Sequence, residues 1–208
     1  MLPSDLVLDA VRAANTAAGL PAIDVSPLQG RLLELLARMA GARRILEIGT
    51  LGGYSTIWLA RALSKGGRLV TLEAEPRHAE IAQANITRAG LADVVDIRVG
   101  LALDLLPALT HEAPFDFIFI DADKSELPDY LSWALKLSRV GTVIIGDNVV
   151  RDGEITSPDC ADPMVQGVQR FLKMIAEEPR LSGTVMQTVG CKGWDGIALA
   201  VVGPPKTE

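Results

Sequence analysis

The chain has 208 residues, of which 49% are hydrophobic, and its net charge at pH 7 is −6. This length and composition predict one globular α/β domain over residues 1–208 with a sizeable core. Acidic residues outnumber basic ones by 26 to 20, and the sequence contains no basic stripe. We therefore expect no nucleic-acid partner. No apolar run approaches about 18 residues and no leader pattern opens the chain, which predicts a cytoplasmic protein without a membrane partner.

Two predicted helices, residues 4–18 and 27–39, lie in residues 1–42, which we expect either to cap a cofactor crevice or to mediate a dimer. Over residues 43–202 strands and helices alternate, which is typical of a mostly parallel sheet with helices on both faces. The predicted strands of the alternating part are 44–48, 68–73, 94–99, 115–121 and 142–146, and the helical segments are 55–63, 76–89, 101–109 and 127–137. A helix at 165–177 precedes strands 183–189 and 196–202, whose short turn at 190–195 predicts an antiparallel hairpin, and residues 203–208 are expected to form a frayed tail.

The segment from Arg44 to Ser55 joins a buried strand to a glycine-rich turn and a helix, an arrangement that can hold a nucleotide-type cofactor. The turn is not the dinucleotide fingerprint Gly-x-Gly-x-x-Gly, because Leu51 stands at its second glycine position. Glu47, just before Gly49, would repel a pyrophosphate but attract the ammonium of an amino-acid moiety. The turn therefore points to S-adenosylmethionine (SAM).

Polar residues follow the predicted strands in series, at the edge of a parallel sheet where ligands gather. Glu73 ends the second strand, 24 residues after Gly49, close to the interval at which an acidic residue reaches ribose hydroxyls. The alternative is a solvated acid at the start of the next helix. A buried strand end favours the ribose role.

Asp121, Asp147 and Asn148 follow the fourth and fifth strands and offer two carboxylates and an amide oxygen, a donor set that suits Mg²⁺. A diol could occupy the remaining coordination positions through two neighbouring oxygens. As an alternative, these residues cap a helix and start a polar loop. The other metal-ligating candidates, Cys160 and Cys191, lack zinc-site spacing and are expected to be ordinary thiols.

Lys124 lies three residues after Asp121. A divalent cation nearby favours the neutral amine over the ammonium, so Lys124 is a candidate general base. An exposed lysine on a turn is the alternative. Asp123, between the two, is expected to be a solvated or capping residue.

With these motifs in place, the sequence resembles the cation-dependent class I O-methyltransferases, which include catechol and caffeoyl-CoA O-methyltransferases. The resemblance runs from about Val25 to Val202. The matching motifs are Leu46-Glu47-Ile48-Gly49-Thr50-Leu51-Gly52-Gly53-Tyr54-Ser55, Thr71-Leu72-Glu73, Phe119-Ile120-Asp121-Ala122-Asp123-Lys124 and Gly146-Asp147-Asn148-Val149. The resemblance implies a Rossmann-like fold with a seven-stranded, mostly parallel sheet, an antiparallel C-terminal hairpin, helices on both faces, and a homodimer.

The resemblance also implies a divalent-metal-dependent O-methyltransferase that acts on a hydroxyl of a small phenolic acceptor with vicinal oxygens, catechol-like or hydroxycinnamoyl-like. It assigns the catalytic role to Lys124, as base, and to Asp121. The implied SAM-binding residues are Val25, Glu47, Gly49, Thr50, Ser55, Glu73, Ala102 and Asp121. The implied ligands of Mg²⁺, or of Mn²⁺ or Ca²⁺ in its place, are Asp121, Asp147 and Asn148.

One position departs from the family pattern, because Glu126 stands where relatives usually have Asn. A carboxylate there can hydrogen-bond or favour a cationic or differently hydroxylated acceptor, and residues 151–166 are expected to cover the acceptor pocket. Two other functions stay open at this point: an NAD-dependent oxidoreductase on a similar sheet, and a non-catalytic dimeric module that only binds the cofactor. Leu51 and Glu47 argue against the first, and the metal-site residues argue against the second.

Overall fold

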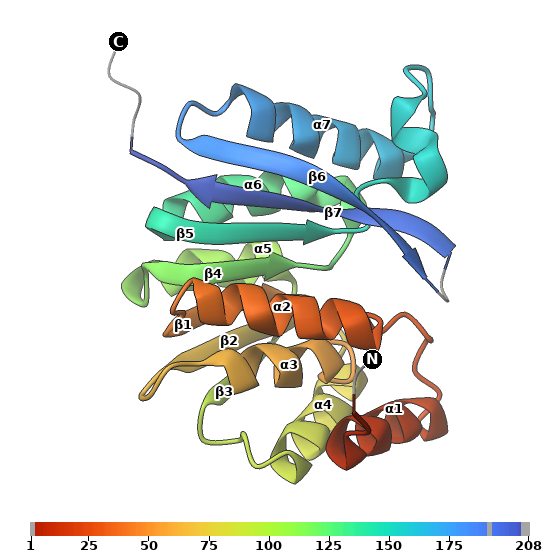
Figure 1. The fold of residues 1–208 in the computed structure, drawn as a ribbon, viewed down its shortest axis with the longest axis vertical. Helices are drawn as coiled ribbons and strands as arrows, with labels where there is room; N and C mark the ends of the chain where they lie inside the picture. Colours follow the sequence, from red (N-terminus) through yellow and green to blue (C-terminus); the bar gives the residue numbers. More distant parts are fainter. Residues whose placement is uncertain (1–2, 191–192, 205–208) are drawn as a thin grey trace. The chain divides into compact units, whose positions relative to one another are not determined.

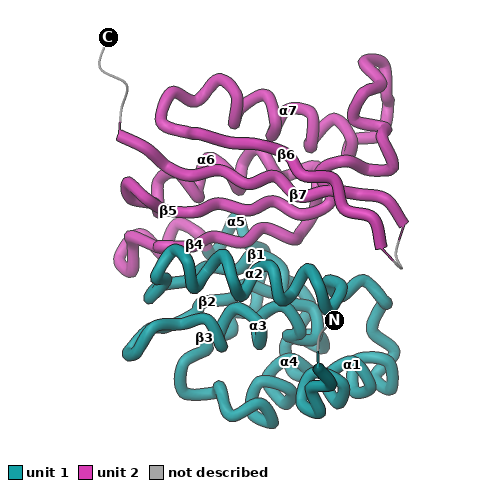
Figure 2. Tube along the Cα trace, viewed as in Figure 1, with its two compact units in different colours: residues 1–105 teal, residues 106–208 magenta. Residues whose placement is uncertain are grey.

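The computed structural model describes residues 3–190 and 193–204. It divides into two compact units, Met1–Leu105 and Leu106–Glu208 (Figure 2). The boundary follows helix α5 (Ala102–Leu105), so the N-terminal helices belong to the same unit as the first three strands. No helix within the described ranges is both long and apolar enough to cross a membrane.

The first unit alternates helices and parallel strands. Its elements are α1 (Leu6–Ala17), α2 (Pro27–Met39), β1 (Arg44–Ile48), α3 (Tyr54–Ala62), β2 (Arg68–Glu73), α4 (Pro76–Arg88), β3 (Val95–Val99) and α5. The strands lie in the order β3-β2-β1, and α2 packs beside α3 (Figure 1). Because Ile48 pairs with Leu72, Gly49 and Glu73 follow at the same level of the sheet edge.

The second unit has two parallel strands extended by an antiparallel hairpin. Its elements are η1 (Leu106–His111), β4 (Phe115–Ile120), η2 (Lys124–Glu126), α6 (Leu127–Lys136), β5 (Ser138–Asp147), η3 (Arg151–Thr156), α7 (Pro163–Glu177), β6 (Leu181–Gly190) and β7 (Gly193–Val202). The strand order is β4-β5-β7-β6, and α7 runs along β6 (Figure 1). Ile120 pairs with Gly146, which brings Asp121 and Asp147 to the same strand ends.

Apolar side chains explain the strands, and polar caps explain where several helices begin. All six residues of β4 are buried, as expected for a parallel strand covered on both faces. Helix α1 begins after Asp5, whose carboxylate accepts the N–H of Leu8 at 3.1 Å. Helix α2 begins after Ser26, whose hydroxyl accepts the N–H of Gln29 at 3.2 Å.

The structure confirms the predicted order of elements, and β1 and β2 have the predicted bounds. Three strands are longer than predicted: β5, β6 and β7 extend beyond their apolar runs because backbone pairing continues where side chains are polar or exposed. The predicted antiparallel hairpin is confirmed, but the predicted turn at 190–195 is too long, since Trp194 pairs with Val189 and Asp195 with Thr188. Cys191 and residues 205–208 of the predicted tail lie outside the described residues.

Candidate functional site

The glycine-rich turn of the first unit connects β1 to α3. Gly49 and Gly53 have φ values of 98° and 82°, a region that favours glycine. Leu51, at the position that departs from the dinucleotide fingerprint, has φ 50° and is also left-handed. The N–H of Gly53 closes the turn on the carbonyl of Thr50 at 2.9 Å. Such a conformation in a non-glycine residue needs support from its surroundings.

Glu73 supplies that support. One of its carboxylate oxygens accepts the N–H groups of Thr50 and Leu51 at 3.0 and 2.7 Å, and the other accepts the N–H of Glu75 at 3.0 Å. His78 Nδ1 lies 3.4 Å from the same second oxygen. Glu73 is only 7% exposed, so the alternative of a solvated acid is wrong. Glu73 holds the turn that the sequence predicts to bind the cofactor.

Glu47 is fully buried beneath the same turn. Its carboxylate accepts hydrogen bonds from the hydroxyls of Ser55, Thr56 and Thr71 at 2.7, 2.5 and 2.7 Å. The Thr71 hydroxyl lies 2.6 Å from that of Thr50. Glu47 thus ties β1 to β2 and to the start of α3, and it brings together three of the predicted cofactor residues. Thr56 and Thr71 join this network although the sequence analysis assigned them no role.

Two buried asparagines also hold the turn, and the sequence analysis missed both. Asn85 Nδ2 donates to the Gly52 carbonyl and to Asn15 Oδ1, each at 2.9 Å. Asn15 and Asn85 are 2% and 1% exposed. A Cβ at Gly52 would lie 2.0 Å from Asn15 Oδ1, so this glycine is required for the close approach. The available signal was an asparagine on the apolar face of α4, beside Ala82 and Ile86.

Two other predicted cofactor residues of the first unit, Val25 and Ala102, lie outside the glycine turn. Val25 is 6% exposed and precedes α2, and Ala102 is half-buried at the start of α5. Their roles toward SAM stay predictions.

In the second unit, Lys124 and Asp121 form an ion pair. Lys124 Nζ lies 2.8 Å from Asp121 Oδ1. Lys124 is 5% exposed, so the alternative of an exposed lysine is wrong. Asp123 caps η2, with its carboxylate accepting the N–H of Ser125 at 2.8 Å, and the capping role expected for it is confirmed. A buried amine beside a carboxylate is a group that can exchange a proton with a ligand at this strand end.

Asp147 and Asn148 end the neighbouring strand. Asp147 is 4% exposed, and its Oδ1 accepts the N–H of Asn148 at 2.8 Å. Asn148 has φ 55° and is half-buried, and its side chain makes no hydrogen bond with any described residue. Within the described ranges no three His, Cys, Asp or Glu side chains converge as a metal site. The predicted set has two carboxylates and one amide, which is an oxygen donor set for a hard cation.

Glu126 already has a partner in the protein. It accepts a short hydrogen bond from the hydroxyl of Tyr130. Burial and the Glu126 carboxylate together raise the pKa of Tyr130 above its usual value. The carboxylate of Glu126, which stands where relatives usually have Asn, is therefore held by Tyr130 of α6.

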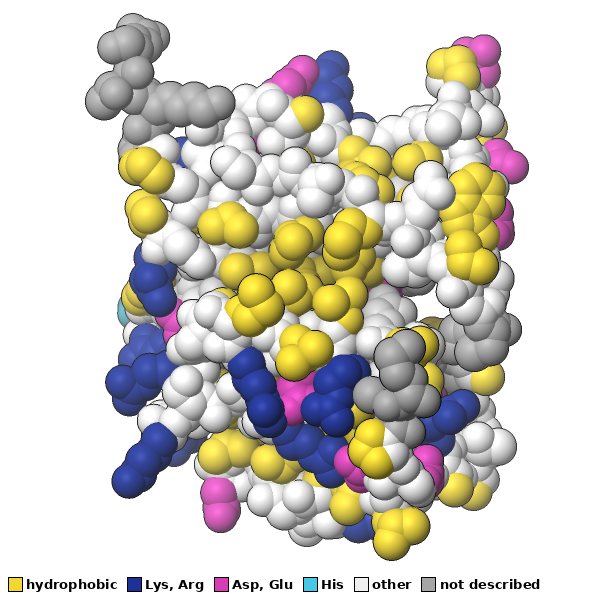
Figure 3. Space-filling model, viewed as in Figure 1, with side chains coloured by type: hydrophobic (Ala, Val, Ile, Leu, Met, Phe, Trp, Pro, Cys, Tyr) yellow, Lys and Arg dark blue, Asp and Glu magenta, His cyan; other side chains and the backbone are white. Residues whose placement is uncertain are grey.

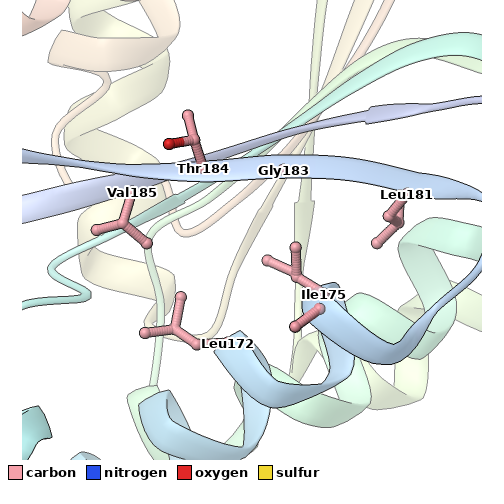
Figure 4. A pocket seen from close by; sticks show the side chains of 7 residues that line it. Leu172, Ile175, Leu181, Gly183, Thr184 and Val185 are labelled. Atoms are coloured by element: carbon pink, nitrogen blue, oxygen red, sulfur yellow. The ribbon is translucent and has the colours of Figure 1, made fainter.

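A separate apolar cavity of about 320 Å³ lies between α7 and β6 (Figure 4). Its lining residues are Leu172, Ile175, Ala176, Leu181, Gly183, Thr184 and Val185. None of the predicted site residues lines it.

Comparison with known proteins decides the family. A model of an O-methyltransferase family matches residues 4–201. The chain belongs to the O-methyltransferase family. It is 54% identical over 199 residues to a catechol O-methyltransferase of Niastella koreensis, covering 93% of this chain and 90% of that relative.

Solved structures give the same result. An O-methyltransferase from Bacillus cereus in complex with SAH has 62% identity and a TM-score of 0.96, covering 97% of this chain and 93% of that chain. The O-methyltransferase TomG from Streptomyces achromogenes, involved in tomaymycin synthesis and solved in complex with SAM, has 51% identity and a TM-score of 0.94, covering 98% and 92%. These findings confirm the class I methyltransferase fold and a SAM-dependent O-methyltransferase. They do not support the oxidoreductase or the non-catalytic module.

Proposed function

We propose that this O-methyltransferase methylates one hydroxyl of a small phenolic acceptor with vicinal oxygens, and that it requires a divalent cation, Mg²⁺ or Mn²⁺ or Ca²⁺ in its place. One observation supports the proposal most directly: Asp121 and Asp147 follow paired residues at the neighbouring ends of β4 and β5. Lys124 contacts Asp121, and Asn148 follows Asp147. The catechol O-methyltransferase of Niastella koreensis, at 54% identity, supports the acceptor class.

The residues fit a cation. Asp121 uses one carboxylate oxygen for Lys124, and the Asn148 amide has no hydrogen-bond partner within the described ranges. Asp121, Asp147 and Asn148 would hold the ion. When bound, such a cation acidifies a hydroxyl and can fix two neighbouring oxygens of one ligand. This requirement for two oxygens is what selects a vicinal acceptor.

Lys124 is proposed as the base. Lys124 pairs with Asp121, and a cation held by the same carboxylate would favour the neutral amine, which would then accept the proton of the acceptor hydroxyl. The acceptor oxygen forms a bond to the methyl carbon while the bond from that carbon to the SAM sulfur breaks. The proton remains on Lys124 Nζ until solvent removes it.

Glu73, Glu47 and the turn between β1 and α3 are proposed to bind SAM. Glu73 would accept from the ribose hydroxyls, and Ser55 and Thr50 would complete the site with Val25, Gly49, Ala102 and Asp121. The hydrogen bonds that Glu47 accepts support this role, because they fix the turn before any ligand binds. Less conformational entropy is then lost when the ligand binds.

The test removes the metal. Chelation should abolish turnover, and added Mg²⁺ should restore it, whereas SAM affinity measured by calorimetry should survive at least in part because Glu47 and Glu73 need no ion. Catechol and its monohydroxyl analogue phenol form a matched acceptor pair, and only catechol should be methylated. Full activity in a metal-free preparation would contradict the metal requirement, and equal turnover of phenol would contradict the acceptor class.

We also propose that two copies of the chain associate. Helix α2 exposes Leu28, Leu35 and Met39, which are 56%, 47% and 82% exposed and lie on one stripe of the helix. Figure 3 shows apolar side chains gathered over α2 beside basic ones. Light scattering after chromatography should give a dimer that Leu35→Glu weakens; a monomeric parent protein would contradict the proposal.

A further inference from the structure

The turn after β5 begins with Asn148, one of the proposed metal ligands, and has an unusual backbone conformation. Asn148, Arg151 and Asp152 have φ values of 55°, 52° and 54°, and Gly153 follows with φ 90°. Left-handed conformations are uncommon in non-glycine residues and persist where surrounding contacts impose them. Three such residues within five positions indicate that something outside the turn holds it.

Asp195 of β7 makes the contacts that hold this turn. A single oxygen, Asp195 Oδ1, accepts the N–H groups of Val150, Arg151 and Gly196 at 2.9, 3.0 and 2.9 Å. The carbonyl of Gly196 accepts the N–H of Val149 at 3.0 Å. Hydrogen bonds to an ionised carboxylate are stronger than those between neutral groups. The backbone immediately after Asn148 is therefore fixed by β7.

Packing around Asp195 adds to the hydrogen bonds. A Cβ at Gly196 would lie 2.4 Å from Val150 Cγ2, so β7 approaches the turn as closely as a glycine permits. A Cβ at Gly153 would lie 3.0 Å from the Trp194 ring. Val150 is 3% exposed. Trp194, Asp195 and Gly196 are consecutive residues of β7, and together they contact the turn after β5.

We propose that Asp195 is a positioning residue for the divalent cation, acting through the turn on Asp147 and Asn148. This inference rests on the metal site proposed above. The amide of Asn148 has no hydrogen bond within the described residues to orient it, so its direction depends on its backbone. Asp195 fixes the backbone at Val150, two residues after Asn148, by accepting its N–H. Loss of a residue that orients metal ligands weakens metal affinity by about 10- to 100-fold.

The experiment measures Mn²⁺ affinity by electron paramagnetic resonance in the whole protein, for the parent chain, Asp195→Ala and Asp195→Asn. Asp195→Ala should weaken Mn²⁺ binding by about 10- to 100-fold. Asparagine keeps one acceptor oxygen but no charge, so Asp195→Asn should show a smaller loss. SAM affinity should stay near that of the parent in both, since the turn between β1 and α3 does not include Asp195.

A matched control separates positioning from general destabilisation. Thr142 is fully buried in the opposite half of β5, where its hydroxyl donates to the Phe115 carbonyl at 2.6 Å and accepts the N–H of Arg139 at 2.9 Å. Thr142→Ala removes two hydrogen bonds from the same unit but none from the turn. It should lower the free energy of unfolding while leaving Mn²⁺ affinity unchanged.

The outcomes distinguish the two proposals. If the parent chain binds no Mn²⁺, the proposed metal site is wrong and the role of Asp195 falls with it. If the parent binds Mn²⁺ and both Asp195 variants bind it equally well, the metal site stands and the positioning role is wrong. Should Asp195→Ala fail to fold, unchanged affinity in Asp195→Asn overturns the inference. An equal loss of affinity in Thr142→Ala also overturns it.

Discussion

Replacing Glu73 by alanine should both loosen the glycine turn and weaken SAM binding. The carboxylate accepts the N–H groups of Thr50 and Leu51 at 3.0 and 2.7 Å. Each of these two buried donors left without a partner costs about 1–3 kcal/mol, so the free energy of unfolding should fall by about 2–6 kcal/mol. Loss of the charged acceptor for the ribose should weaken SAM binding by about 1–3 kcal/mol, which is roughly a 5- to 150-fold rise in Kd.

Urea denaturation measures the first effect, and calorimetry on the folded variant measures the second. Glu75→Ala is the matched control, because Glu75 is exposed at the start of α4 and its side chain makes no capping hydrogen bond. Glu73→Gln keeps one acceptor oxygen and should lose less stability than Glu73→Ala. The reasoning is refuted if Glu73→Ala and Glu75→Ala have the same stability and the same SAM affinity as the parent.

Three further predictions concern single side chains. Lys124→Met should leave SAM affinity near that of the parent while kcat falls by roughly 10²–10⁴, with partial recovery at higher pH; an equal kcat, with chemistry rate-limiting, would exclude the base. Asn85→Ala removes the donor to the Gly52 carbonyl, so the KM for SAM should rise more than kcat falls, and steady-state kinetics decides this. The Arg61 guanidinium lowers the pKa of Asp5, so its contribution to stability is present above the unfolded value of 3.8 and is lost as pH falls through the folded value. Acid unfolding of Asp5→Asn should therefore depend less on pH below about 4 than that of the parent, and identical pH profiles would contradict this.

Local sequence signals were sufficient to predict the bounds of an element where the residues at its own ends determine them. The strands β1 and β2 were predicted at their observed bounds, because each is a short, mostly apolar segment that ends before a local signal: Gly49 follows β1, and Glu73 is the last residue of β2. Helix α2 follows from Ser26 and Pro27, since a capping hydroxyl and a proline at the first position are both local features. Strand ends were less predictable where pairing continued beyond the apolar run, as in β7.

The sequence by itself also determined the family, since its motifs at the glycine turn and at Asp121 and Asp147 resemble those of the O-methyltransferases that the comparisons then identified. The roles of those residues toward SAM and metal stay predictions. What only the tertiary structure decided is which side chains hold the turns. Asn85 lies 33 residues from the Gly52 carbonyl it binds, and Asp195 lies 45 residues from the N–H of Val150. No local pattern encodes such pairs, because a hydrogen bond forms only after strand pairing and helix packing have brought its donor and acceptor within about 3 Å of each other.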